Sequence, residues 1–254
     1  MAQKKEEQEK EIKENNLIQR VNMTKIKSVK KLSLWLFIIP FVSINICLLI
    51  STNYEYLQNT IFLVDQIGRS YFTIPYIDGS LSISRASRTY PQYLIFKPTM
   101  IIVSIMLYFF WQKNNILFKE LFNKPDLKLT FANHGIISSF CFCFHVIFLG
   151  IDFDLDLFKL FKRAALISFV VFQLTAMVSL LQNTYKLKNM IKNLIRLNFL
   201  YLLIVLTLVM VLVAVAIAPF LMTLGHIQLK HMIEWNYFTM IITYYLVFSI
   251  MWKK

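Results

Sequence analysis

The stretch that decides the fold is LYLLIVLTLVMVLVAVAIA, residues 200–218, in which Tyr201 and Thr207 are the only polar side chains. A helix rises about 1.5 Å per residue, so a run of this length crosses roughly 30 Å of hydrocarbon. Strands that cross a membrane alternate apolar and polar residues over about ten positions, and this run does not alternate. The stretch therefore predicts a transmembrane helix.

Similar apolar segments recur on both sides of this stretch. The predicted spans are residues 33–51, 94–112, 135–151, 164–185, 197–220 and 234–252. Hydrophobic residues make up 57% of the 254-residue chain, whereas soluble proteins contain about 45–50% apolar residues. We expect an all-α fold, a polytopic transmembrane helix bundle of about six spans. A charged tail, residues 1–32, precedes this membrane domain, residues 33–252.

Lys and Arg are distributed unevenly between the predicted loops. Residues 1–32, 113–128, 186–196 and the C-terminal tail together hold 19 of the 27. Because such residues favour the cytoplasmic side, the chain is expected to be N-in and C-in. The net charge of +13 then reflects topology, and no nucleic-acid partner is expected. The charged start and a first apolar segment of spanning length predict no cleavable signal. The membrane is a bacterial inner membrane or a eukaryotic endomembrane or plasma membrane.

Tryptophan and cysteine positions follow the predicted spans. Each tryptophan lies within a few residues of a span boundary, where such rings favour the headgroup layer: Trp35, Trp111, Trp235 and Trp252. The three cysteines lie inside spans and are expected to be small core residues: Cys47, Cys141 and Cys143.

The longest predicted loop, residues 52–93, lies on the non-cytoplasmic side and is rich in Tyr and Phe. Such a loop would expose apolar surface to water, so we expect residues 75–93 to pack over the bundle as an ordered lid. Residues 82–85 alternate polar and apolar, which predicts a short strand or an extended lid. Arg85 and Arg88 would face headgroup phosphates or acids at helix ends. A protein partner for this loop or for the N-terminal tail is the other possibility.

The end of this loop carries a family resemblance in LSISRASRTYPQYLIF, residues 81–96. Its Ser-Ile-Ser element, aromatic-Pro pair and following helix resemble the first-loop signature of a six-span family. That family groups the damage-regulated autophagy modulators, the GPI-anchor lipid-remodelling factor and the N-terminal region of a yeast cell-wall protein. Residues 75–78 and the pair Glu234-Trp235 resemble further elements of the autophagy branch. The resemblance implies a role in lipid-anchor handling or membrane organisation, with no catalytic residue and no cofactor.

Two histidines mark the third predicted span. His134 and His145 are separated by about three helical turns, so they share one helix face. With Ser138, and with Gln173 and Thr175 of the next helix, they could line a water-filled or headgroup-binding cavity. The alternative is a neutral histidine that is hydrogen-bonded to a hydroxyl or carbonyl group of the bundle.

A second cluster, His226, His231 and Glu234, opens the last predicted span. Helical steps of 100° make His231 and Glu234 neighbours and leave His226 less well placed. The spacing differs from the His-Glu-x-x-His motif of zinc proteases, so no metal is expected. The sequence predicts a hydrogen-bonded His231–Glu234 pair at the headgroup level.

Three alternating aspartates follow the third span. They resemble the start of a calcium loop, but Leu157 and Arg163 replace the glycine and glutamate that such a loop needs. A solvated turn is expected instead, in which the aspartates pair with nearby cations: Asp152, Asp154 and Asp156 with Lys159, Lys162 and Arg163.

Two functions remain open. The first is a lipid-interacting accessory or membrane-organising factor that binds membrane lipids. The second is an intramembrane lipid-modifying enzyme or carrier that uses His145, His226, His231 and Glu234, and it requires these four residues to converge. The candidate lipid- or partner-binding residues are Asp78, Ser82, Ser84, Arg85, Arg88, Tyr90, His134, His145, His226, His231, Glu234 and Trp235.

Overall fold

The computed structural model describes residues 23–53, 57, 60, 73–151, 155–221 and 225–253, and these contain helices without any β-strand. The helices are α2 (Met23–Thr52), α3 (Pro75–Asp78), α4 (Ile83–Ser87), α5 (Gln92–Leu121), α6 (Thr130–Phe148), α7 (Asp156–Lys186), α8 (Lys188–Ile191), α9 (Leu197–Leu221) and α10 (Ile227–Met251). The predicted all-α bundle is confirmed. Our predictions for residues 1–22, Asp152 and Asp154 lie outside the described residues.

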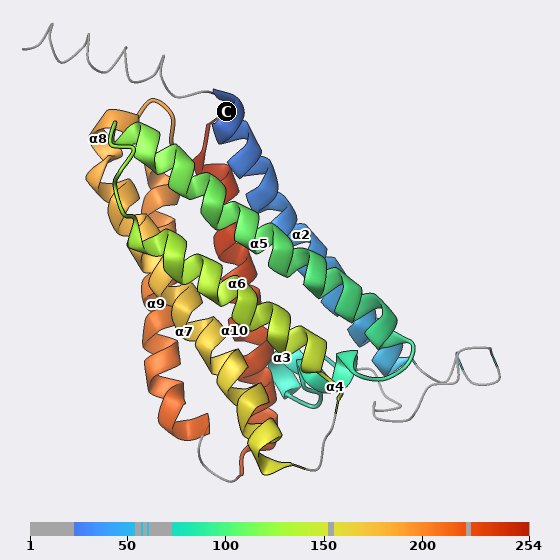
Figure 1. The fold of residues 1–254 in the computed structure, drawn as a ribbon. Coiled ribbons are helices and arrows are strands. Elements are labelled where there is room, and N and C mark those ends of the chain that lie inside the picture. The colour runs from blue at the N-terminus through green and yellow to red at the C-terminus, as the bar shows by residue number, and fades with distance from the viewer. Residues whose placement is uncertain are drawn as a thin grey trace, which may run out of the picture.

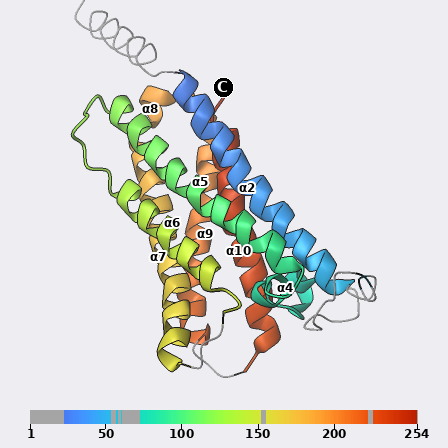
Figure 2. The ribbon, with the colours of Figure 1, turned by 45° about the vertical axis from the view of Figure 1, so that its right-hand side comes forward.

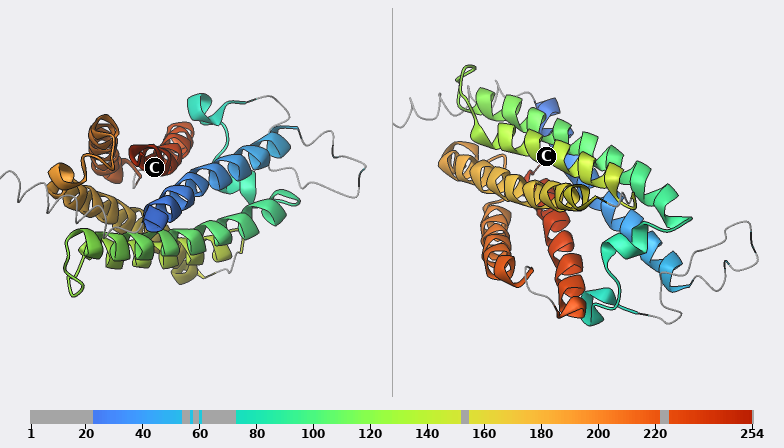
Figure 3. Two further views of the ribbon diagram at one scale, coloured as in Figure 1. Left: turned by 90° about the horizontal axis from the view of Figure 1, so that it is seen from above. Right: turned by 60° about the horizontal axis from the view of Figure 1, so that its bottom comes forward.

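Six long helices form a ring in chain order (Figure 1). Each helix packs against the next, from α2 through α5, α6, α7 and α9 to α10, and α10 packs back against α2. The view from above shows this closure (Figure 3). The start of α2 and the end of α10 lie at the same end of the bundle, which we call the terminal end; the loop before α5 lies at the opposite, cap end (Figures 1 and 2).

Hydrogen bonds at the terminal end join the first and last helices. Lys30 Nζ donates to the Trp252 carbonyl (3.1 Å), and Ser249 Oγ donates to the Lys30 carbonyl (3.0 Å). The backbone N–H of Arg196 donates to the Met251 carbonyl (2.8 Å). An even number of bundle crossings follows from this arrangement of the ends, as N-in and C-in topology requires.

Among the described residues, five helices are long and apolar enough to cross a membrane: α2, α5, α6, α7 and residues 197–217 of α9. Each also exposes large apolar side chains to the surroundings, including Leu49, Ile105, Phe140, Val171 and Leu212. An apolar belt of this kind needs lipid as its solvent, because soluble proteins rarely expose continuous apolar surface. The chain is therefore built as an integral multi-pass membrane protein.

The predicted sixth span, α10, is as long as α9 but is not among these five. Its first turns carry Lys230, His231, Glu234 and Asn236, which lower its hydropathy. Asn236 is the only residue from 230 to 252 that is exposed. The other residues of this range are buried or half-buried, because α10 packs between α9 and α2 and runs the length of the bundle (Figure 1).

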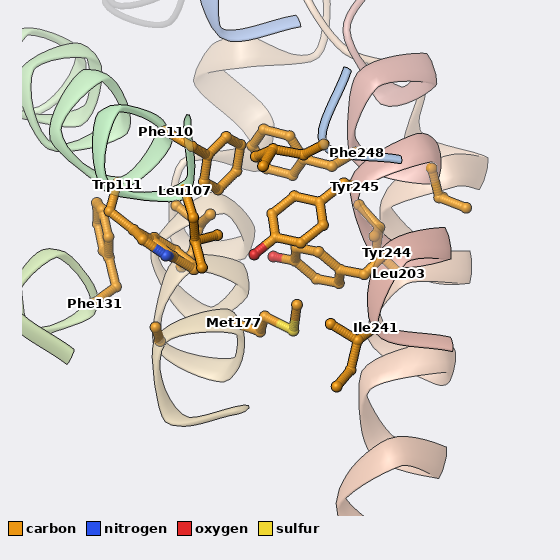
Figure 4. Close-up of a cluster of buried hydrophobic side chains, with 14 of the residues drawn as sticks. Leu107, Phe110, Trp111, Phe131, Met177, Leu203, Ile241, Tyr244, Tyr245 and Phe248 are labelled. Carbon is orange, nitrogen blue, oxygen red and sulfur yellow. The ribbon is translucent and has the colours of Figure 1, made fainter. Parts of the chain in front are cut away.

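The middle of the bundle is filled with aromatic side chains (Figure 4). Phe110 meets Tyr245 edge to face, with ring centroids 5.1 Å apart. Trp111 lies so close to α6 that a Cβ on Gly135 would come within 2.1 Å of its ring. The neighbouring apolar hollow, lined by Leu107, Phe142 and Tyr245 among others, measures only ≈ 30 Å³, about the share of one water molecule in the liquid.

Two local predictions are wrong. Trp111, Trp235 and Trp252 are fully buried rather than placed at the headgroup layer, and Trp35 alone is exposed, at 42%. These large rings pack between helices, because packing there buries more of their apolar surface than a position at the membrane–water interface would. Residues 83–87 form helix α4 rather than a strand, because Ser82 caps its start. Cys47 is buried as predicted, while Cys141 and Cys143 are half-buried, and all three are free thiols.

Candidate functional site

The segment between α2 and α5 forms an ordered cap on α10. We define the cap as residues 73–91, which include α3 and α4. Three side chains of α10 donate hydrogen bonds to backbone carbonyls of the cap: Asn236 Nδ2 to Tyr76 (2.7 Å), His231 Nδ1 to Gly79 (3.0 Å) and Trp235 Nε1 to Leu81 (2.7 Å). These bonds satisfy carbonyls that the short helices leave unpaired. The predicted lid is confirmed for these residues.

His231 precedes the predicted apolar span of α10. Burial lowers the pKa of its imidazole, the backbone bond to Gly79 opposes this shift, and the charge of Arg85 adds to it. Burial therefore favours the neutral form of the ring. Since a carbonyl only accepts, Nδ1 carries the proton in this tautomer. His231 therefore orients the cap as a hydrogen-bond donor.

Gly79 allows the cap to touch the backbone of α10. Its φ is +58°, in the left-handed region that favours glycine. A Cβ at this position would lie 1.7 Å from the Gln228 carbonyl oxygen. Any other residue would push α3 away from α10.

The cap also contacts α2. The Tyr76 ring packs on Trp235 at 4.9 Å between centroids, and its hydroxyl donates to Asn45 Oδ1 (3.3 Å). Ser51 Oγ donates to the Ala86 carbonyl (3.0 Å). The cap thus joins the first and last helices of the ring at the cap end.

Glu234 holds the start of α4. The backbone N–H groups of Ile83 and Ser84 donate to its carboxylate, and the N–H of Arg85 donates to Ser82 Oγ (3.2 Å). The first amides of a helix lack partners inside the helix, so these acceptors cap α4. The predicted His231–Glu234 pair is wrong, because each side chain bonds to cap backbone instead. Ser84 Oγ lies 3.4 Å from Ser82 Oγ.

The remaining cap candidates have separate positions. Asp78 is exposed and accepts from the N–H groups of Ile74 (3.1 Å) and Ser80 (2.8 Å), so it stabilises its own turn. Tyr90 packs on Tyr93, with centroids 5.9 Å apart. Arg85 and Arg88 are both exposed. They are the two cations of α4 and its C-cap, and they face outward.

The polar stripe predicted in the third span is formed only in part. Ser138 Oγ donates to Gln173 Oε1 (2.8 Å), and Gln173 Nε2 donates to the Tyr245 hydroxyl, all buried. Thr175 is exposed and bonds within its own helix. The two histidines sit away from this chain of hydrogen bonds.

The histidines have local partners. His134 bonds through Nδ1 to the Thr130 carbonyl (2.9 Å) and stacks on Phe172. His145 lies beside the backbone of Lys162 on α7, and its buried Nδ1 has no hydrogen-bond partner among the described residues. His226 is exposed at the N-cap of α10, with φ +50°. The four residues that an enzyme or carrier would need, His145, His226, His231 and Glu234, therefore do not share one site. In the described ranges, no three His, Cys, Asp or Glu side chains are grouped to hold a metal ion.

Comparison with known proteins found no matching family model, no matching curated protein and no matching solved structure. The resemblance to the six-span autophagy and lipid-remodelling family consequently stays a prediction that rests on the residues quoted for it. Several residues of the cap interface have no recognisable signal in the sequence. Asn45, Ser51 and Asn236 each form hydrogen bonds to a segment distant in the chain, which spacing along the chain does not reveal.

Proposed function

We propose that the protein is a lipid-interacting, membrane-organising factor whose cap binds the phosphates of lipid headgroups through Arg85 and Arg88. The family resemblance supports a role in lipid-anchor handling. The observation that carries the proposal is that the cap is held by α10 and α2 while both arginines remain exposed.

The position of the arginines fits the headgroup layer. Leu94, 51% exposed, begins the lipid-facing side of α5, six residues after Arg88. Arg88 also lies next to the end of α6. A Cβ added to Gly150, which follows α6, would be 3.4 Å from the Cβ of Arg88. Arginine side chains so close to the apolar belt can reach phosphates. The planar guanidinium binds phosphate with two parallel hydrogen bonds.

Lipid binding by the purified chain tests the proposal. Each basic residue near an anionic surface contributes about 1 kcal/mol, so Arg85→Gln with Arg88→Gln should weaken binding to vesicles with anionic lipid by roughly 30-fold. Arg163→Gln is the matched control, because Arg163 is exposed on α7 at the same end and outside the cap. Equal binding by the double variant and the control would refute the role of the cap.

The geometry gives less support to the enzyme or carrier function. Its four candidate residues have separate partners or lie apart. Aromatic rings pack around Tyr245 in the middle of the bundle (Figure 4). If the purified protein turned over membrane lipids and Glu234→Gln lost this activity with the cap still folded, the enzyme function would be favoured over the lipid-binding one.

A further inference from the structure

The side of α10 that faces away from the bundle is marked by a line of incompletely buried residues. α10 packs between α9 and α2 at the edge of the ring (Figure 3). Within residues 241–252 every side chain is buried except three that are half-buried: Thr243, Leu246 and Ile250. The half-buried Thr239 and the exposed Asn236 continue this line toward the cap end. We call these five residues the outward face of α10.

The spacing of the outward face is that of a contact between two helices. Its residues follow one another at alternating intervals of three and four positions, from Asn236 to Ile250. This is the spacing of the a and d positions of a coiled coil, in which one such seam packs against another. Helices in membranes commonly pair with the same left-handed geometry. None of the five side chains is charged, and a single Asn at an a position fixes the register of such a pair.

Two polar groups of the outward face have no partner within the described part of the chain. Asn236 Nδ2 donates to the carbonyls of Tyr76 (2.7 Å) and Met232 (2.9 Å), but its Oδ1 accepts no hydrogen bond there. The Thr243 hydroxyl forms none in the same ranges. Thr243 lies roughly 24 Å from the start of α10 and 12 Å from its end, which is within the hydrocarbon layer. Lipid tails cannot satisfy these groups, because they carry no hydrogen-bonding atom.

We propose that a second copy of this chain docks on the outward face, with the two α10 helices side by side across a twofold axis along the membrane normal. Copies in one membrane have the same orientation, so their α10 helices run parallel and each position meets itself. The second copy therefore presents polar groups at the depths where they are needed.

The two polar side chains of the outward face are self-complementary. The Thr243 hydroxyl of one copy donates to the same hydroxyl of the other, since a hydroxyl both donates and accepts. The Asn236 amide keeps one Nδ2 hydrogen on Tyr76 of the cap. Its other hydrogen exchanges the Met232 carbonyl for the amide oxygen of the second copy. The proposal does not depend on headgroup binding at the cap.

Cysteine cross-linking of the full-length chain in vesicles tests which face forms the contact. The native cysteines are first replaced by Ala: Cys47, Cys141 and Cys143. Thr243→Cys and Ile250→Cys should then form disulfide-linked dimers on oxidation, because each position meets itself across the axis. Ile105→Cys, at a position that is 50% exposed on α5, is the control and should stay monomeric. Cross-linking at position 105 and not at 243 or 250 would overturn the proposal.

Single-molecule photobleaching of the labelled natural chain at decreasing density in vesicles measures the dimer without cross-links. Asn236→Ala and Thr243→Val should each raise the dissociation constant by roughly 3- to 20-fold, the range for one hydrogen bond between membrane helices. Thr243→Val keeps the cap contacts, so it remains informative if Asn236→Ala loosens the cap. Thr175→Val is the matched control, because Thr175 is exposed on α7 and bonds within its own helix. A chain that is monomeric at every density, or dimers that neither variant weakens, would overturn the proposal and leave the outward face to lipid.

Discussion

Two neighbouring helices of equal length, α9 and α10, differ in what surrounds them. α9 is almost entirely aliphatic and exposes Leu202, Val205, Leu208 and Leu212. α10 carries charged and amide side chains, yet from residue 230 onward only Asn236 is exposed. The apolar helix exposes many of its side chains, whereas those of the more polar helix are mostly buried or half-buried.

The contrast between α9 and α10 concerns where polar side chains of a membrane protein find hydrogen-bond partners. A polar group in hydrocarbon must find a partner within the protein. On α10 the partners are the backbone of the cap and the hydroxyl and amide groups of the bundle. Polar residues of this helix, among them His231 and Trp235, therefore form contacts within the protein.

The largest expected effect separates the two helices directly. Trp235→Ala removes a fully buried ring and the donor to Leu81, so we expect the free energy of unfolding to fall by about 3–5 kcal/mol. Leu208→Ala on α9 removes lipid-exposed surface and should cost only about 0.5 kcal/mol. Unfolding in mixed micelles by a denaturing detergent measures both. Similar losses of unfolding free energy in the two variants would contradict the difference in burial between α10 and α9.

A charge on the lipid-facing helix is the second test. Val209 lies in the middle of α9 and is 41% exposed. Val209→Lys should raise the free energy of membrane insertion by about 2.5–3.5 kcal/mol, which a glycosylation-mapping assay detects as lower insertion of α9. Val209→Leu is the control and should insert normally. Normal insertion of the lysine variant would contradict this cost.

The sequence predicted the fold well and the site unevenly, for a physical reason. Apolar run length is a local property, so residues 200–218 alone identify their helix. Hydrogen-bond partners across the fold are not local: Glu234 and His231 are neighbours on one helix, yet their partners lie some 150 residues earlier in the chain. The pair Glu234-Trp235 marks Trp235 in the sequence, but its role as an anchor of the cap depends on its hydrogen bond to Leu81, which no spacing indicates.

A smaller effect is expected where α10 caps α4. Glu234→Gln keeps the shape of the side chain but replaces one acceptor oxygen with an amide that cannot accept the N–H groups of Ile83 or Ser84. Loss of a charged acceptor should lower stability by about 1–2 kcal/mol and loosen α4. Limited proteolysis checks this, since trypsin should cut faster at Arg85 and Arg88. Ile77→Ala, an exposed position of α3, is the control, and equal cutting rates in the two variants would contradict the cap role of Glu234.

The smallest effect concerns two adjacent tyrosines of α10 that differ in one hydrogen bond. The Tyr245 hydroxyl accepts from Gln173 Nε2, whereas the buried Tyr244 hydroxyl has no partner among the described residues. Hydrogen bonds between helices in membranes contribute about 0.6 kcal/mol on average and up to about 1.7, so Tyr245→Phe should destabilise the bundle within that range. Tyr244→Phe removes an unpaired group and should be neutral or stabilising. Equal losses for the two variants, measured by the same detergent unfolding, would mean that the Ser138–Gln173–Tyr245 chain does not stabilise the bundle. In that case the contribution of the buried tyrosines of α10 to stability would come from the burial of their rings and not from hydrogen bonds.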